Sequence, residues 1–179
     1  MSTNRTHGSG NTGPGDGVPE NRRCGGEDGH GSKDQRLTLE QAGLDGDERA
    51  VLQLLRHYCV SYSSPESQDW EVALAEGRRV FGSLVGAQIA VSVHDVLCAM
   101  RVARKSMFLF TNPYCSCCRN KISRDELRLL RIIQTVRGRA SYSLRAEAMI
   151  LCEGFNAEPL LEAVARLSDY LLPASAATA

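Results

Sequence analysis

Apolar residues recur at helical spacing through most of this chain, whereas the alternating pattern of a half-buried β-strand is absent. Between Val51 and Tyr62 an apolar side chain returns every three or four residues, as on one face of an amphipathic helix. Asp45 and Glu48 precede this segment with the spacing of a capping box, which marks a helix start. The pattern predicts a helix that begins at Asp45.

The same periodicity, with its start and stop signals, predicts further helices over residues 64–84, 92–105, 124–137, 143–152 and 156–173. Ser64-Pro65, the pair Ser92 and Asp95, and the pair Ser123 and Glu126 supply their start signals. Residues 39–42 indicate a short lead-in turn, and the apolar run 107–110 fits either a helical turn or an extended stretch. The prediction is an all-α protein, a compact bundle of five to seven helices.

Composition divides the chain into one domain and two tails. Of 179 residues 42% are hydrophobic, which is enough for the core of a single domain. Residues 1–35 hold nine glycines and hardly any large apolar side chain, so they cannot bury enough surface to offset the entropy of ordering. We therefore predict a disordered tail over 1–36, a helical domain over 37–173 and a flexible tail over 174–179.

Three of the seven cysteines lie within four positions, which packing alone hardly explains. Cys115 and Cys118 have the spacing at which a turn brings two sulfurs to one zinc ion, and His94 and Cys98, one helical turn apart, can complete a tetrahedral set. Cys117 then supports the site, replaces a ligand or is its reactive thiol. An iron–sulfur cluster is the alternative centre, although the spacing matches no standard cluster motif.

Two other interpretations of the cysteines stay open. Cysteines on apolar helical faces, such as Cys59, Cys98 and Cys152, commonly pack as small hydrophobic residues. A Cys-x-x-Cys pair before a helix is also used in dithiol chemistry, but such oxidoreductases place it after a β-strand, and this chain predicts too few strands. Reversible oxidation without catalysis, with Cys117 as the redox-active thiol, is compatible with the pattern.

Positive charge gathers in one part of a chain whose formal net charge is zero. Residues 101–145 contain eleven basic residues and two acidic ones, a local net charge of +9 that favours an anionic partner. Such a stripe can also be only the solvated face of a helix, or dock an acidic protein. The candidate nucleic-acid contacts are Arg119, Lys121, Arg124, Arg128, Arg131, Arg137 and Arg139.

These features favour a regulatory protein over an enzyme. No phosphate-binding glycine loop, serine nucleophile motif or paired-histidine zinc motif occurs in the chain. Without a secretory signal pattern or a long uninterrupted apolar stretch, we expect a cytoplasmic protein with no membrane partner. Our hypothesis is a redox sensor or zinc-dependent regulator of transcription whose cysteines control the adjacent basic helix. The alternatives are an adaptor with structural zinc and, less favoured, a small thiol oxidoreductase.

Overall fold

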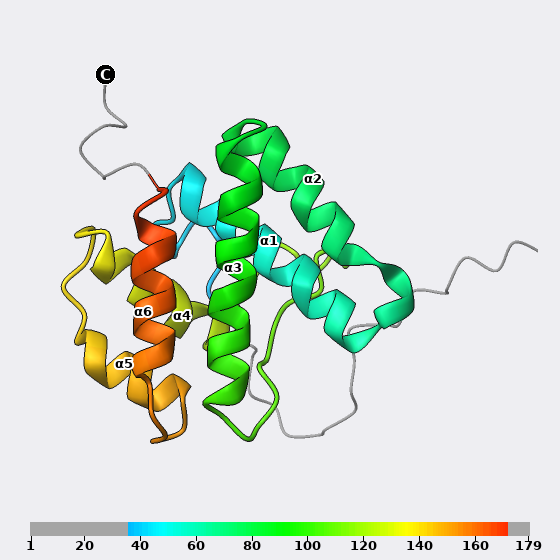
Figure 1. The fold of residues 1–179 in the computed structure, drawn as a ribbon. Helices are drawn as coiled ribbons and strands as arrows, with labels where there is room; N and C mark the ends of the chain where they lie inside the picture. The colour runs from blue at the N-terminus through cyan, green and yellow to red at the C-terminus, as the bar shows by residue number, and fades with distance from the viewer. Residues whose placement is uncertain (1–35, 172–179) are drawn as a thin grey trace, which may run out of the picture.

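The computed structural model describes residues 36–171, and in this part of the chain it contains six α-helices, one short 3-10 helix and no β-strand (Figure 1). The predicted all-α class is confirmed. The tails predicted over 1–36 and 174–179 lie outside the described residues, apart from Arg36. The elements are α1 (Gly46–Ser63), η1 (Pro65–Ser67), α2 (Asp69–Phe81), α3 (Val85–Val102), α4 (Arg124–Val136), α5 (Leu144–Leu151) and α6 (Glu158–Ser168).

Helix α3 is the central helix of the bundle, with α1 and α2 on one side and α6 on the other (Figure 1). Its buried residues, Ile89, Val93 and Met100 among them, join the core that α1, α4 and α6 share. Helix α4 packs against α5 and α6. By length and composition α3 is apolar enough to cross a membrane, a criterion that buried core helices also meet.

Both predicted capping boxes are present. At the start of α1, Asp45 Oδ1 accepts a hydrogen bond of 2.8 Å from the Glu48 amide, and Glu48 Oε2 accepts one of 3.2 Å from the Asp45 amide. Ser123 and Glu126 make the corresponding pair at the start of α4, at 3.1 and 2.8 Å. These local side-chain bonds satisfy backbone donors that a helix start leaves free, so their sequence pattern locates the two helices accurately.

The predicted starts of α2 and α3 are wrong. Ser64-Pro65 opens only the 3-10 turn, and α2 begins at Asp69, after Gln68 adopts a left-handed conformation with φ of 52°. Helix α3 begins at Val85, so Ser92 lies inside it and caps nothing. Helices α2 and α3 cross closely at Gly77 and Gly86. A Cβ added to Gly86 would lie 2.1 Å from the Gly77 carbonyl oxygen, so the absence of a side chain permits this crossing.

Between α3 and α4, residues 103–123 form no helix or strand. This segment contains Cys115, Cys117 and Cys118. The apolar run 107–110, for which periodicity left two interpretations open, is not helical. Its backbone is tied to the first turn of α4, because the Leu109 amide donates to Asp125 at 2.9 Å and the Leu109 carbonyl accepts from the Ser123 hydroxyl at 2.5 Å.

Candidate functional site

The clustered cysteines lie in a series of tight turns over residues 112–121, which we call the cysteine loop. The Cys115 amide donates to Asn112 O at 3.2 Å, and the Cys115 carbonyl then accepts from the amides of Cys118 and Arg119 at 3.2 and 2.9 Å. A last bond of 2.7 Å joins the Lys121 amide to Cys118 O. Because the turns are closed by backbone bonds, the loop directs its three thiols to one place.

The three sulfur atoms lie within 4.8 Å of one another. Cys117 Sγ is 3.1 Å from Cys115 Sγ and 3.5 Å from Cys118 Sγ. Sulfurs around a tetrahedral zinc ion with bonds of about 2.3 Å lie about 3.8 Å apart, so only a small expansion separates this arrangement from a three-thiolate site. Cys115 is buried, Cys118 half-buried and Cys117 exposed, which leaves an approach from solvent.

His94 and Cys98 do not join this group. Their predicted proximity on the helix is found, with Cys98 Sγ 3.6 Å from His94 Nε2, and both contact the Tyr62 hydroxyl, at 2.9 Å from His94 Nε2 and 3.4 Å from Cys98 Sγ. The group of mutually close ligand atoms that includes Cys115 and Cys118 contains Cys117 instead. The predicted four-ligand set is therefore not assembled in this structure.

The remaining described cysteines fit the packing interpretation. Cys59 and Cys152 are buried in the core. Burial raises the pKa of Cys59 to about 12 and raises the pKa of Cys152 as well, since a charged thiolate is disfavoured in an apolar surrounding. Both thiols are consequently poor nucleophiles and poor metal ligands at neutral pH.

A fully buried arginine of α1, Arg56, connects the cysteine loop to α4. Its two terminal nitrogens donate to the carbonyls of Arg119 and Lys121 at 2.7 and 2.6 Å, and its Nε donates to Glu126 Oε1 at 2.8 Å. The sequence pattern did not identify Arg56. An arginine within the apolar face of a predicted helix could have indicated it, because a buried arginine needs partners in the fold. The guanidinium links the end of the loop to the carboxylate that caps α4.

The same carboxylate also holds the chain just before the loop. The Thr111 amide donates to Glu126 Oε1 at 3.0 Å, and the Thr111 hydroxyl donates to Oε2 at 3.2 Å. Glu126 is fully buried, yet its charge is balanced by Arg56 and its oxygens are filled by hydrogen bonds. Both ends of the cysteine loop thus meet at one buried ion pair.

A third anchor lies at Tyr114, beside the first cysteine. Its hydroxyl donates to Asp69 Oδ2 at 2.8 Å, and the same oxygen lies 3.1 Å from His57 Nδ1. Burial and this hydrogen bond to Asp69 raise the pKa of Tyr114 to about 12. The cysteine loop is therefore attached to α1, α2 and α4 while Cys117 remains exposed.

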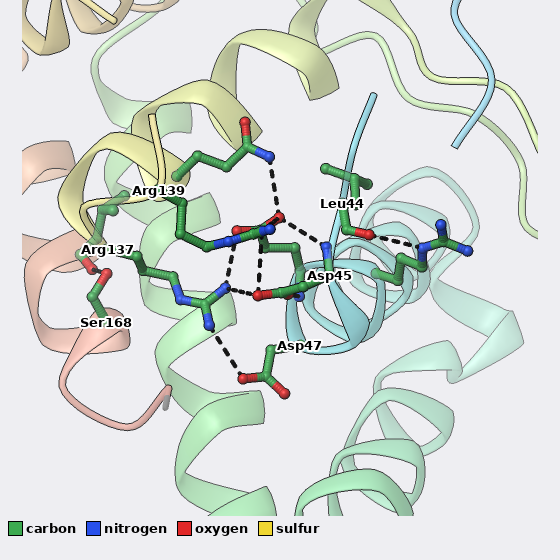
Figure 2. A network of polar contacts seen from close by, with 10 residues as sticks. Leu44, Asp45, Asp47, Arg137, Arg139 and Ser168 are labelled. Carbon is green, nitrogen blue, oxygen red and sulfur yellow. Dashed lines mark hydrogen bonds and ion pairs between the residues drawn. The ribbon is translucent and has the colours of Figure 1, made fainter. Parts of the chain in front are cut away.

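Most of the predicted nucleic-acid contacts on and after α4 are occupied by acids of the same chain. Arg128 and Arg131 pair with Glu147 of α5 at 3.0 and 3.2 Å. Arg137 and Arg139 point toward the start of α1, where Asp45, Asp47 and Glu48 accept their hydrogen bonds (Figure 2). The sequence pattern concealed this arrangement, because the acids belong to other helices.

Arg119, Lys121 and Arg124 lie in or directly after the cysteine loop. Arg119 and Arg124 are exposed, and Lys121 is half-buried. Of the seven basic residues predicted to contact nucleic acid, these three are the ones nearest the thiols in sequence.

Comparisons with models of protein families, with curated proteins and with solved structures find no match to this chain. A functional proposal therefore has to come from the chemistry of the site. The site offers three convergent thiols on a loop joined to a buried ion pair.

Proposed function

We propose that this protein is a regulatory protein that binds a thiophilic metal ion, with zinc expected, through Cys115, Cys117 and Cys118. The observation that carries the proposal is the convergence of these three sulfurs within 4.8 Å. Thiolates are the ligands that zinc and other soft ions prefer in proteins. The exposed side of Cys117 leaves room for a fourth ligand, such as a water molecule or a group from a partner.

Metal binding would change the position of the start of α4, because hydrogen bonds connect the cysteine loop to Glu126. Expansion of the three sulfurs around an ion shifts Cys118, whose carbonyl accepts from Lys121, and Lys121 O is held by Arg56. Arg56 in turn binds Glu126, the capping residue of α4. An ion can change the balance between two arrangements of the cysteine loop only if it binds one of them more tightly than the other. The proposal therefore requires that the loop differ in structure with and without the ion.

We propose a nucleic acid as the partner that responds to this change, contacted by Arg119, Lys121 and Arg124. The charge around the loop supports it, since Arg119 and Arg124 are exposed and Lys121 is half-buried, and exposed basic side chains can contact phosphates. The four more distant arginines serve ion pairs within the chain, so the contact area is smaller than the charge pattern suggested. An acidic protein docking at the same three residues is the alternative partner.

Reduced full-length protein is expected to bind one zinc ion, because the three thiolates form one site. Cobalt(II) substitution should give thiolate-to-metal charge-transfer absorption, and zinc should displace the cobalt. Simultaneous Cys115→Ser, Cys117→Ser and Cys118→Ser substitutions should abolish both signals, since hydroxyls are poor zinc ligands. Metal analysis after dialysis and the cobalt spectrum are the measurements.

Cys98→Ser is the matched control, because Cys98 is a half-buried thiol outside the three-sulfur group. We expect its zinc affinity to equal that of the unaltered chain. Loss of binding in Cys98→Ser as large as in the triple variant, or no charge-transfer absorption in the unaltered chain, would contradict the proposal.

Reversible oxidation of the same loop is a second candidate function, favoured by the 3.1 Å separation of Cys115 Sγ and Cys117 Sγ. With hydrogen peroxide as oxidant, one thiolate attacks an oxygen, the O–O bond breaks, and a sulfenic acid forms as hydroxide leaves. The second thiolate then displaces hydroxide from the sulfenic acid to give a disulfide, and the two protons that the thiols lost on ionisation convert both hydroxides to water. Two thiols are oxidised, and one peroxide is reduced to two waters.

Mild peroxide treatment of the metal-free protein is expected to give one disulfide within residues 115–118. Cys59 and Cys152 should stay reduced, because burial raises the pKa of both. Alkylation, digestion and mass spectrometry locate the oxidised residues. Oxidation of Cys59 or Cys152 at the same rate as the loop cysteines would rule out a selective redox function.

A further inference from the structure

A second candidate site lies away from the thiols, between the ends of α1 and α3 and the segment that follows α3. A cavity of about 310 Å³ is present there, and none of its lining residues belongs to the cysteine loop. Its volume is at the lower end of the range for small-molecule sites. The residues that the argument uses are Tyr62, Arg101, Arg104, Lys105, Phe108 and Phe110, and we call the space they line the basic cavity.

The lining of the basic cavity carries three cations and no carboxylate. Arg104 pairs with Asp125 at 3.1 Å and with Glu153 at 3.7 Å. The side chains of Arg101 and Lys105 make no ion pair within residues 36–171 and contact aromatic rings, while the Lys105 backbone amide donates to Glu153 at 2.9 Å. The Arg101 guanidinium lies 3.7 Å from the centre of the Tyr62 ring, and Lys105 Nζ lies 5.1 Å from that of Phe155.

Arg104 adds an unfilled hydrogen-bonding position. Its side chain is only 7% exposed, and its Nη1 is buried without a hydrogen-bond partner in the described part of the chain. Buried donors in folded proteins are nearly always paired, so this nitrogen leaves Arg104 incompletely satisfied by its own chain, although as a buried atom it does not itself face the cavity. An anionic group in the cavity would face the charges of Arg101 and Lys105.

Most of the remaining cavity wall is apolar. Phe108 and Phe110 come from the segment after α3, Leu97, Met107 and Cys59 add further apolar surface, and Ser63 and Ser106 are the polar residues among them. Burial raises the pKa of Cys59, so this thiol presents a neutral surface. A ligand that satisfies both parts of the wall needs an acidic group and a hydrocarbon body.

We propose that the basic cavity binds a small amphipathic anion, namely a carboxylate carried on a hydrocarbon body. The carboxylate lies among Arg101, Arg104 and Lys105, and the hydrocarbon lies against Phe108 and Phe110. The site is separate from the thiol centre, and its occupancy requires neither metal nor oxidation.

Three probes of equal chain length separate charge from hydrophobicity: octanoate, octan-1-ol and octyltrimethylammonium. Calorimetric titration of the reduced full chain is expected to show octanoate binding ~10-fold more tightly than either other probe, because only octanoate meets the cations favourably. Octanoate affinity should fall with added sodium chloride, whereas octan-1-ol affinity should not. This salt comparison requires no variant.

The double substitution Arg101→Gln and Lys105→Gln should weaken octanoate binding about 10-fold and leave octan-1-ol binding unchanged. Both residues are exposed, so helicity measured by circular dichroism should be preserved. Arg78→Gln, on the exposed surface of α2 and outside the cavity lining, is the control. Equal affinity for octanoate and octan-1-ol, or equal octanoate affinity in the double variant and Arg78→Gln, would overturn the proposal.

Discussion

Replacing Arg56 with Met is expected to lower the free energy of unfolding by about 3–5 kcal/mol, the effect of breaking a buried ion pair from one side. Arg56 and Glu126 are both fully buried, and the substitution leaves the Glu126 carboxylate without its balancing charge. It also removes the donors to the carbonyls of Arg119 and Lys121. Methionine retains most of the side-chain volume, so the effect comes from charge and hydrogen bonding.

Urea unfolding followed by circular dichroism measures this change. Arg79→Met is the matched control: Arg79 pairs with Glu76 on the exposed surface of α2, and we expect its unfolding midpoint to stay near that of the unaltered chain. Equal midpoints for Arg56→Met and Arg79→Met would show that the buried pair does not stabilise the fold.

The sequence predicted elements whose signals are local. Ser123 with Glu126 and Asp45 with Glu48 locate helix starts because the bonds join residues three apart. The starts of α2 and α3 depend on features without such a signal. Gln68 adopts a left-handed conformation that glycine or asparagine usually provides, and the close crossing at Gly77 depends on a helix that comes later in the chain.

In the candidate site, too, the sequence predicted contacts between residues near in the chain and not those between distant segments. The spacing of Cys115, Cys117 and Cys118 requires only a turn to bring the sulfurs together, and the structure has that turn. Whether His94 reaches them depends on the path of the chain between α3 and α4, which residue spacing does not determine. Helical spacing correctly placed His94 beside Cys98 but could not indicate Tyr62 as their shared neighbour.

The charge pattern of the sequence did not reveal the acids that pair with four of the arginines, for a related reason. A run of arginines with few acids nearby in sequence indicates a free cationic face only if no acid approaches from elsewhere in the fold. Glu147 approaches α4 from α5, and Asp45 and Glu48 approach from the start of α1, about ninety positions earlier. The capping box of α1 and the arginines after α4 therefore form one polar network (Figure 2).

Glu48 is the centre of that network, and Glu48→Ala is expected to lower the free energy of unfolding by about 3 kcal/mol or more. The side chain is fully buried and accepts from Arg137 at 2.9 Å, from Arg139 at 2.5 Å and from Gln134 at 3.1 Å. The Glu48 hydrogen bond raises the pKa of Arg139, and this arginine still stays charged without it, because a guanidinium keeps its proton at neutral pH even when unpaired. Alanine would remove the buried carboxylate and leave the half-buried carboxylates of Asp45 and Asp47 beside the two guanidiniums.

Thermal and urea unfolding of Glu48→Ala, compared with Glu162→Ala, test this expectation. Glu162 is an exposed residue within α6, so its replacement changes helix composition and net charge equally but breaks no buried ion pair. We expect a clear loss of stability for Glu48→Ala and almost none for Glu162→Ala. Similar unfolding midpoints for the two variants would mean that the buried Glu48 carboxylate and its bonds to Arg137 and Arg139 do not stabilise the fold.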